Sequence, residues 1–517
     1  MNILKKNKIL TVFLLIFLVE MLSLISFKIA WLSGLFFVLI CTGVFLITWK
    51  KLEYGIYVVL TELIIGSQGY LFYLVLPGFK ASIRLGIFLI VFFVWLIKYL
   101  KPRIFLNLLK RDALVQNFIL LLIFVAFGTI NGIINKNGLT NVFFDVNGYL
   151  YFGLFFAFLE VFKSIEQIKK FLKIFIGAMI YECTKVFLTL YLFSHDYFIN
   201  ASDLFYHWIR DTRVGEITYA GGNFFRIFFQ SQIWALIGIF IIICLIIWVM
   251  QKKPLCHPER SEGSKTLGVI DSSHSFGMTE RVWLFLLLTI IQTSIIISFS
   301  RSFWVGAIAA FIILLGYLVF IYKPGFKIIS KIIGISASSL ILSIFLVIFI
   351  ANFPIPKPSS ELSAQLIGAR FLSFFGEAGV SSRWNELPSL LEKIKQSPVF
   401  GSGHGTTITF KSEDPRIKNE QNPEGWYTTY TFEWGYLDTL IEIGILGLLV
   451  CLVFIGQIAY MGLKTLKNKE YGLISAGLLL GLVAMLVTHM FSPYLNHPLG
   501  IGYLMLCASI FKSKPSD

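Results

Sequence analysis

Residues 282–322 read VWLFLLLTIIQTSIIISFSRSFWVGAIAAFIILLGYLVFIY and contain two apolar runs on either side of Arg301. Each run is about as long as the roughly 20-residue helix that crosses a bilayer. The stretch therefore predicts two membrane-spanning helices joined by a short turn, with Arg301 at the turn. A guanidinium group at such a boundary is either an interfacial anchor or part of a functional site, because charge within a membrane is costly.

The rest of the chain repeats this apolar pattern. The 517 residues are 56% hydrophobic and only 14% charged, they include 52 Phe, and their mean hydropathy is +0.78. Soluble domains do not have this composition, so the sequence predicts an all-α polytopic membrane protein with about 12–14 transmembrane helices. Fourteen candidate spans can be placed at 9–26, 29–49, 54–76, 82–100, 114–134, 147–163, 171–194, 227–250, 282–299, 302–322, 327–352, 436–462, 470–490 and 496–511.

The distribution of Lys and Arg predicts the orientation, because basic loops resist translocation across the membrane. If Met1 is inside, the basic clusters at 5–8, 98–111 and 252–281 all fall on the inner side, and an even number of spans makes both termini cytoplasmic. The net charge of +15 then indicates topology and attraction to anionic lipids, and no nucleic-acid partner is expected. The six cysteines show no CxxC spacing, and we expect no metal and no cofactor.

Two loops differ in composition from the spans. The inner segment 256–280, CHPERSEGSKTLGVIDSSHSFGMTE, resembles the translated product of a dispersed bacterial genomic repeat and is predicted to be a flexible insertion. The alternative interpretation of this segment is a metal site, because it contains His257 and His274. The segment 353–435 is predicted to be one large outer loop between late spans, and loops of this length usually carry function.

The large loop contains an expected helix and a glycine turn. In SSRWNELPSLLEKIKQSP, residues 381–398, Trp384, Leu387, Leu391 and Ile394 recur at three- and four-residue spacing, which predicts a short amphipathic helix. Three glycines at 401, 403 and 405 then form a turn around His404.

Four motifs in this order resemble the O-antigen ligase and polymerase family, whose bacterial members handle lipid-linked polysaccharide. They are SFSRSFWVG at 298–306, SSRWNEL at 381–387, PVFGSG at 398–403 and EWGYLDTLIEIGILG at 433–447. The resemblance covers about residues 215–455. We therefore divide the chain into N-terminal spans at 1–194, a ligase/polymerase-like core at 195–455, and C-terminal spans with a short cytoplasmic tail at 456–517.

The resemblance implies a glycosyltransferase C-type arrangement of helices in the bacterial inner membrane. It implies transfer of a glycan from an undecaprenyl-pyrophosphate donor to an acceptor sugar hydroxyl at the periplasmic face, without a metal or nucleotide. In the ligase type the acceptor is lipid A core, and in the alternative polymerase type it is a growing polysaccharide. A transporter of polysaccharide or lipid-linked sugar is a third interpretation, although the sequence shows no repeated halves.

The resemblance also implies site residues. Arg301 and Arg226 would bind the diphosphate, because a guanidinium donates to phosphate oxygens through two parallel hydrogen bonds. Glu433 stands where the family has a loop histidine and is the first candidate for the general base, with partial burial expected beside Phe432 and Trp434. His404 is the second candidate, with a solvent-exposed loop histidine as the alternative. Secondary candidates are Arg213, Arg383 and Tyr436.

Ionisable residues inside predicted spans are functional candidates as well. Glu182 and Lys185 are three residues apart, so they should lie on one helix face and neutralise each other. Glu62 stands alone in the third span, and Asp438 and Glu442 lie in the first turns of the twelfth. These groups are the basis of the transporter interpretation.

Overall fold

The structure is a computed structural model that describes residues 6–195, 203–251, 272–356, 358, 378–414, 417–468 and 472–513. Within these ranges, nine helices are long and apolar enough to cross a membrane, or ten if the bent pair Leu139–Val146 and Tyr149–Val161 is one span. The prediction of an all-α polytopic membrane protein is therefore confirmed.

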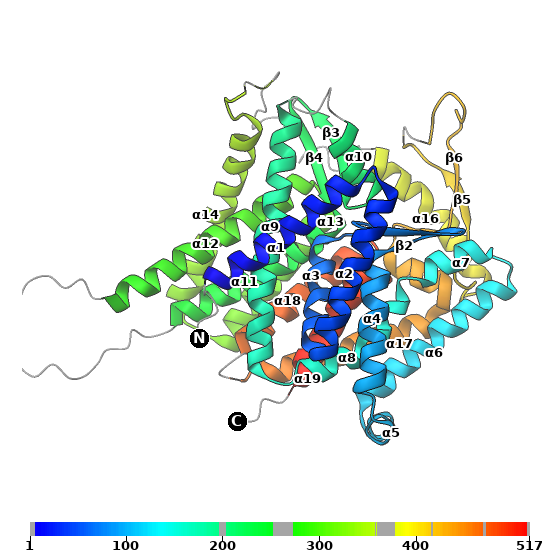
Figure 1. The fold of residues 1–517 in the computed structure, drawn as a ribbon, viewed down its shortest axis with the longest axis horizontal. Coiled ribbons are helices and arrows are strands. Elements are labelled where there is room, and N and C mark those ends of the chain that lie inside the picture. The colour runs from blue at the N-terminus through cyan, green and yellow to red at the C-terminus, as the bar shows by residue number, and fades with distance from the viewer. Residues whose placement is uncertain are drawn as a thin grey trace, which may run out of the picture.

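The N-terminal part places most of its helices around the outside of the bundle (Figure 1). In it, α1 packs on α9, and α2 packs on α3 and α4. Its elements are α1 (Lys6–Ser26), α2 (Ala30–Lys50), α3 (Leu52–Ile65), β1 (Tyr73–Leu76), β2 (Phe79–Ser82), α4 (Ile83–Lys98), α5 (Pro102–Arg111), α6 (Ala113–Ile134), α7 (Leu139–Val146), η1 (Tyr149–Leu154), α8 (Phe155–Val161) and α9 (Ile165–Ser194).

The C-terminal part supplies the centre of the bundle. Its elements are α10 (Asp203–Asp211), β3 (Gly215–Gly221), β4 (Phe224–Phe229), η2 (Gln230–Gln232), α11 (Ile233–Gln251), α12 (Ser272–Ser298), α13 (Arg301–Gly316), η3 (Tyr317–Tyr322), α14 (Phe326–Ala351), α16 (Ala378–Gln396), β5 (Ile408–Lys411), β6 (Trp426–Thr429), α17 (Gly435–Thr465), α18 (Gly472–His489) and α19 (Pro498–Lys512).

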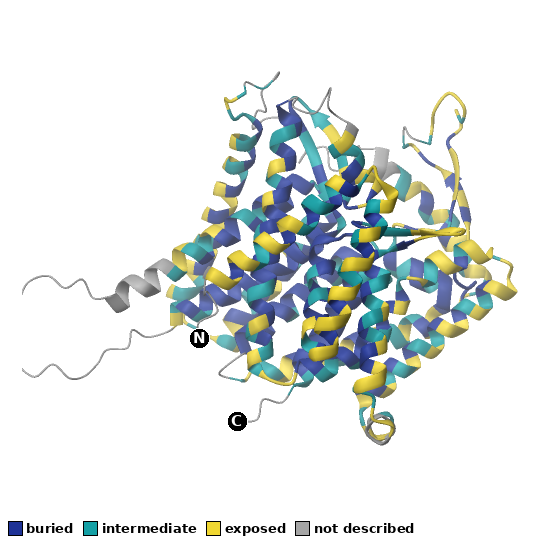
Figure 2. Cartoon of the chain, viewed as in Figure 1, coloured by how far each residue is buried: buried dark blue, intermediate teal, exposed yellow. Residues whose placement is uncertain are grey.

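The two helices at the centre, α11 and α18, are apolar on every face, as expected of helices surrounded by other helices. Small residues let them approach closely, because a Cβ atom on Gly477 would lie 2.8 Å from the Cα of Ile241. Helix α12 packs on α11, and α13 packs on α18. Figure 2 shows the buried residues at this centre and exposed residues along outer helices such as α2 and α14, on the faces that would meet lipid.

Nine of the fourteen predicted spans correspond to the nine long apolar helices of the described residues, and five do not. The predicted span 54–76 is wrong after Ile65, where α3 ends and the chain continues into the β1–β2 hairpin. Helix α4 is 16 residues long, α19 is 15, and 147–163 falls in the bent pair. Helix α9 has 30 residues but carries several charges, which lower its hydropathy.

Glu62 does not stand alone, so that prediction is wrong. The guanidinium of Arg84 at the start of α4 donates two hydrogen bonds to it, 2.8 Å from Nε and 2.9 Å from Nη2, and both side chains are buried. The pair joins α3 to α4 and neutralises the carboxylate locally. The two side chains therefore need no further role to explain their presence in a membrane protein.

The predicted insertion can be compared with the structure only in part. Residues 256–271, with His257, lie outside the described residues. Residues 272–280 form the first turns of α12, so the prediction of a flexible loop is wrong for them. The cause is their position directly before an apolar run, which extends the helix towards the N-terminus.

The predicted Glu182–Lys185 pair is confirmed and has a third member. Lys185 Nζ lies 2.8 Å from a carboxylate oxygen of Glu182 and 2.8 Å from one of Glu20 on α1. Tyr181 donates to Glu20 at 2.9 Å and Ser231 donates to Glu182 at 2.6 Å, and all of these groups are buried. The network therefore fixes α1 and α9 to the segment that precedes α11.

Lys185→Met is expected to destabilise the protein by about 3–5 kcal/mol, because it leaves two buried carboxylates without their cation. Lys169→Met on the same helix is the matched control, since Lys169 pairs at 2.8 Å with the exposed Glu166 and such surface pairs contribute about 0–1 kcal/mol. Thermal unfolding in detergent and the yield of monodisperse protein measure both. Equal stability of the two variants would contradict a structural role for the network.

Candidate functional site

Several elements outside the long apolar helices gather on one side of the molecule, whereas α5 lies at the other end (Figure 1). Figure 1 shows α10, the β3–β4 hairpin and α16 on the side opposite both chain termini, with the β5–β6 hairpin beside α16. The three two-stranded sheets of the described residues are all antiparallel hairpins. The sequence did not predict these hairpins, and they determine where several candidate side chains lie.

Arg226 lies on β4 and not at a helix end. In this strand Ile227 and Phe229 are fully buried, so the alternation of the strand turns Arg226 and Phe228 to the opposite face. Arg226 Nε donates to the carbonyl of Ser298 at 2.9 Å, and its guanidinium carbon lies 4.9 Å from the centre of the Phe228 ring. The hairpin therefore fixes Arg226 directly beside the turn that precedes Arg301.

Arg301 begins α13, as the two apolar runs predicted. The preceding turn is tight, with Phe299 at a φ of +47° and Ser300 in the N-cap position. The hydroxyl of Ser302 lies 3.1 Å from that of Ser300 and 3.1 Å from that of Ser492. Hydroxyl groups therefore surround the first turn of the helix, at the side of the membrane where Arg226 lies.

Arg383 and Glu433 lie 50 residues apart in the large outer loop and form an ion pair. Arg383 is on α16, and Glu433 is two residues before the start of α17. The side chain of Glu433 is 55% exposed, so the expected partial burial beside Phe432 and Trp434 is wrong. Trp434 instead donates its indole N–H to the carbonyl of Arg383 at 3.0 Å, which fixes the loop to the helix.

One cavity of about 420 Å³ brings four of the predicted residues together. Arg226, Arg301, Arg383 and Glu433 all line it, although they come from a strand, two helices and a loop. Its other lining residues with polar side chains include Glu216, Gln230, Ser300, Ser302, Asp414, Ser492, Tyr494 and His497. Three guanidinium groups and the three carboxylates of Glu216, Asp414 and Glu433 therefore meet at one cavity.

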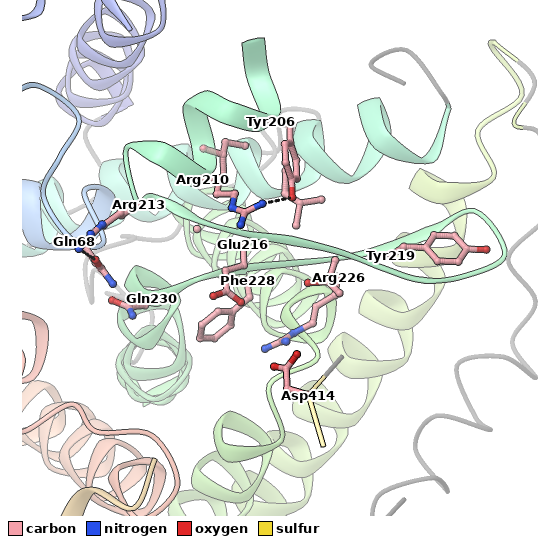
Figure 3. A pocket seen from close by; sticks show the side chains of 14 residues that line it. Gln68, Tyr206, Arg210, Arg213, Glu216, Tyr219, Arg226, Phe228, Gln230 and Asp414 are labelled. Carbon is pink, nitrogen blue, oxygen red and sulfur yellow. Dashed lines mark hydrogen bonds between the residues drawn. The ribbon is translucent and has the colours of Figure 1, made fainter. Parts of the chain in front are cut away.

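A larger cavity of about 760 Å³ continues from the first and shares Glu216, Arg226 and Asp414 with it (Figure 3). Figure 3 shows the guanidinium of Arg226 and the carboxylate of Asp414 facing each other. Arg213 lies at the far end, where Nη1 donates to Gln68 at 3.4 Å. The secondary candidate Arg213 is therefore in a neighbouring cavity and not beside Arg301.

The motif analysis missed His497, which lines the cavity from the N-cap position of α19. Its Nδ1 accepts from the amide of Leu499 at 3.3 Å, so the proton of the neutral ring is assigned to Nε2. Burial lowers the pKa of His497 to about 3, which keeps the ring neutral at physiological pH. Its signal in the sequence is the His-Pro pair at the start of the predicted span 496–511.

Tyr436 is placed by the structure against α18. Its hydroxyl donates to the carbonyl of Leu486 at 3.0 Å, and its ring lies 4.7 Å from that of His489. It lines neither of the two cavities just described. These contacts position the start of α17, one turn after Glu433.

His404 is fully buried, so the alternative of a solvent-exposed loop histidine is wrong. The turn that carries it is clamped between two helices. The amide of His404 donates to the carbonyl of Gly128 on α6 at 3.1 Å. The amide of Gly403 donates to the backbone carbonyl of Glu442 on α17 at 3.0 Å. Burial lowers the pKa of His404 below its ordinary value.

The kink in α17 makes this clamp possible. Gly444 has a φ of +70°, a left-handed conformation that glycine adopts without strain, and it interrupts the helical hydrogen bonds. The carbonyls of Ile441 and Glu442 are then free to accept from the amides of Ser402 and Gly403. Glu442 and Gly444 of the fourth motif therefore have a structural role: the kink at Gly444 lets the backbone of α17 bind the glycine turn.

Helix α16 forms as predicted, but its expected apolar face is covered in part, with Ile394 packed against a small core of the outer loop. Leu390 is fully buried against Phe410 and Phe432, whereas Trp384 and Leu391 are 54% and 43% exposed. Glu386 lies on the buried side, and one of its oxygens accepts from the amide of Glu433 at 3.4 Å. Glu386 therefore supports the backbone of the first candidate base.

Burial raises the pKa of Glu386 to about 7, so the folded protein binds this proton more tightly than the unfolded chain does. The stability that results is complete below the ordinary pKa of 4.5 and is lost as the pH rises towards 7. Glu386→Gln is therefore expected to raise the melting temperature at pH 8 by roughly 1–4 °C and to converge with wild type near pH 5. Differential scanning fluorimetry measures this, with the exposed Glu392→Gln as control. A variant less stable than wild type at pH 8 would be the opposite result.

A second group of ligand-type side chains lies beneath this surface. The oxygens and nitrogen of Asp145, His404 and Glu442 all lie within 4.8 Å of one another, which makes them the one metal-compatible group of His, Cys, Asp or Glu among the described residues. Asp145 also lines a third cavity of about 460 Å³, which shares Gln230 and His497 with the arginine-lined cavity.

The structure is that of a polytopic membrane protein with a polar cavity that three arginines line. Residues 283–452 match a family described as O-Antigen ligase, which confirms the resemblance to the O-antigen ligase and polymerase family. The match contains Arg301, Arg383 and Glu433, and it supports a ligase or polymerase that acts on lipid-linked glycans. The curated proteins contain no match to the chain.

Proposed function

We propose that the protein transfers a glycan from an undecaprenyl-pyrophosphate donor to an acceptor sugar hydroxyl at the outer face of the bacterial inner membrane. The observation that carries this proposal is the convergence of Arg226, Arg301 and Arg383 on one cavity that Glu433 also lines. The match at 283–452 supports the general class of reaction, and the donor and the acceptor are our inference.

The arginines have a direct chemical task in this reaction. The bond between the anomeric carbon and the phosphate oxygen breaks, and its electron pair stays on the diphosphate, which gains one negative charge. Guanidinium groups bind that charge more strongly in the transition state than in the ground state, which lowers the barrier. The arginines also never lose their protons at physiological pH, so no metal is needed for this charge.

Glu433 supplies the second half of the reaction. As the acceptor hydroxyl attacks the anomeric carbon, its proton passes to the carboxylate of Glu433, and the new glycosidic bond forms. The ion pair with Arg383 orients this carboxylate between the two substrates. Phosphate oxygens of the donor compete for Arg383 and release the carboxylate to accept the proton.

The location of the cavity supports the proposed orientation. Figure 1 shows both termini on the side opposite the β3–β4 hairpin, and the basic clusters at 98–111 and 464–469 favour that side as cytoplasmic. The cavity then faces the periplasm, where undecaprenyl-linked glycans are used. Arg226, Arg301 and Glu433 lie in the proposed core 195–455, whereas His497 comes from the C-terminal segment.

Ligase and polymerase share this donor chemistry and differ in the acceptor. We propose the ligase type, with lipid A core as acceptor, and the polymerase type, with a growing polysaccharide as acceptor, is the alternative. The purified protein is to be reconstituted in vesicles with radiolabelled undecaprenyl-pyrophosphate oligosaccharide and each acceptor in turn. Label on lipid A core alone supports the ligase, and label that accumulates on longer lipid-linked chains assigns a polymerase.

A further inference from the structure

The glycine turn 401–405 is held more firmly than a connecting loop requires. Three of its residues, Gly401, Gly403 and Gly405, have φ values of +76°, +87° and +75°. Its carbonyl groups also accept from Asn131, Asn135 and Asn137 at and just after the end of α6, at 2.9–3.1 Å. All of these contacts have one result, which is that the His404 side chain is directed into the protein, where it is fully buried.

The partners that meet His404 are two carboxylates. His404 Nδ1 lies 3.4 Å from an oxygen of Glu442 on α17 and 4.0 Å from one of Asp145 on α7. The His404 ring contacts the backbone of Val125, and within the described residues Oε1 of the buried Glu442 has no hydrogen-bond partner. A buried carboxylate oxygen with this unmet hydrogen-bonding capacity is costly unless something else binds it.

The cluster contains more carboxyl groups than basic groups. Within the described ranges, His404 is the one basic side chain within ion-pair distance of Asp145 or Glu442. Asp438 lies one helical turn before Glu442 and adds a third buried carboxylate, of which Oδ1 has no hydrogen-bond partner in the same ranges. A divalent cation would compensate this charge where no Lys or Arg does.

The surrounding groups resemble those that support metal ligands. Tyr149 donates to the Glu442 oxygen that faces His404, at 3.3 Å, and the amide of Gly405 donates to Asp145 at 2.6 Å. Such outer hydrogen bonds orient carboxylates towards a metal ion. The Nδ1–oxygen distance of 3.4 Å is also close to the edge of a tetrahedron built on zinc–ligand bonds of about 2.0–2.1 Å. Asp145 lines an open cavity, which gives an ion a path to the cluster.

We propose that Asp145, His404 and Glu442 bind a divalent transition-metal ion, Zn²⁺ first, which ties the glycine turn to α7 and α17. One nitrogen and two carboxylate oxygens are ligands that zinc accepts. The site is separate from the arginine-lined cavity, which His404 does not line, and the ion has a structural role there. The proposal departs from the sequence-based expectation that the protein binds no metal.

The test is elemental analysis of the full-length protein, purified through a tag without histidine. We expect about one equivalent of zinc per chain in wild type. Glu442→Gln and His404→Gln should each retain less than about a tenth of it, whereas His207→Ala, which removes an exposed histidine, should retain all of it. Metal content that is equal in wild type and in the Glu442 and His404 variants would overturn the proposal, because the ion would then be adventitious.

A second measurement on wild type does not depend on the folding of a variant. Removal of metal with EDTA should lower the apparent melting temperature, and Zn²⁺ at micromolar concentration should restore it, because a ligand that binds only the folded state stabilises it. Co²⁺ added to the stripped protein should give visible absorption bands of a four-coordinate site, and Asp145→Asn should lose them. An unchanged melting temperature and no bands would overturn the proposal.

Discussion

Arg301→Lys is expected to lower kcat/KM for glycan transfer by about 100-fold or more, even though the positive charge is retained. Lysine is a point charge and cannot donate two parallel hydrogen bonds to phosphate oxygens, so the developing charge on the diphosphate is stabilised less well. Arg301→Ala should lose at least as much. Initial rates of label transfer in reconstituted vesicles, at several donor concentrations, separate an effect on kcat from one on KM.

Arg281→Lys is the matched control for this variant. Arg281 is an exposed residue at the other end of the same helical hairpin, and its replacement should leave the rate unchanged. Near-normal turnover with lysine at position 301 would contradict the diphosphate role. Arg301 would then be an anchor at the membrane interface, which was the other interpretation of an arginine at this boundary.

Glu433→Gln is expected to lower the rate of transfer by about 10²–10⁴-fold while donor binding survives. The amide keeps the size of the side chain and can still contact Arg383, but it cannot accept the proton of the acceptor hydroxyl. Binding of a non-transferable undecaprenyl-pyrophosphate analogue and single-turnover transfer measure the two properties separately. Loss of kcat with little change in donor affinity is the expected pattern.

Glu424→Gln provides the control for the loss of a carboxylate from the same outer segment. Glu424 is 68% exposed, lies near Lys411, and is outside the arginine-lined cavity. Transfer by Glu433→Gln at the wild-type rate would exclude Glu433 as the base.

The membrane helices could be predicted from sequence because a run of about 20 apolar residues is the length that a helix needs to cross the hydrocarbon core of a bilayer. The same reasoning failed where apolar residues form something other than a span. Leu71 and Phe72 are buried in the connection between α3 and β1, and they extended the predicted span 54–76 past its end at Ile65. A hydropathy window does not distinguish a buried hairpin connection from a helix.

The site was predicted in part for a similar reason. Arg301, Arg383 and Glu433 could be found because each lies in a local motif, and the structure brings them together with Arg226. His497 and the pairing of Asp145 with His404 could not, since His497 is 64 residues from Glu433 along the chain and Asp145 is 259 residues from His404. Such contacts depend on how α6, α7, α17 and α19 pack, and no local pattern encodes that packing.

The central claim is that the arginine-lined cavity transfers a lipid-linked glycan, and one experiment tests it most directly. Wild type and Arg301→Ala, purified and reconstituted in vesicles, are incubated with radiolabelled undecaprenyl-pyrophosphate oligosaccharide and acceptor, and the label is followed. We predict that label moves onto the acceptor with wild type and not with the variant. Label that crosses the vesicle bilayer without reaching any acceptor would contradict the claim and indicate a carrier.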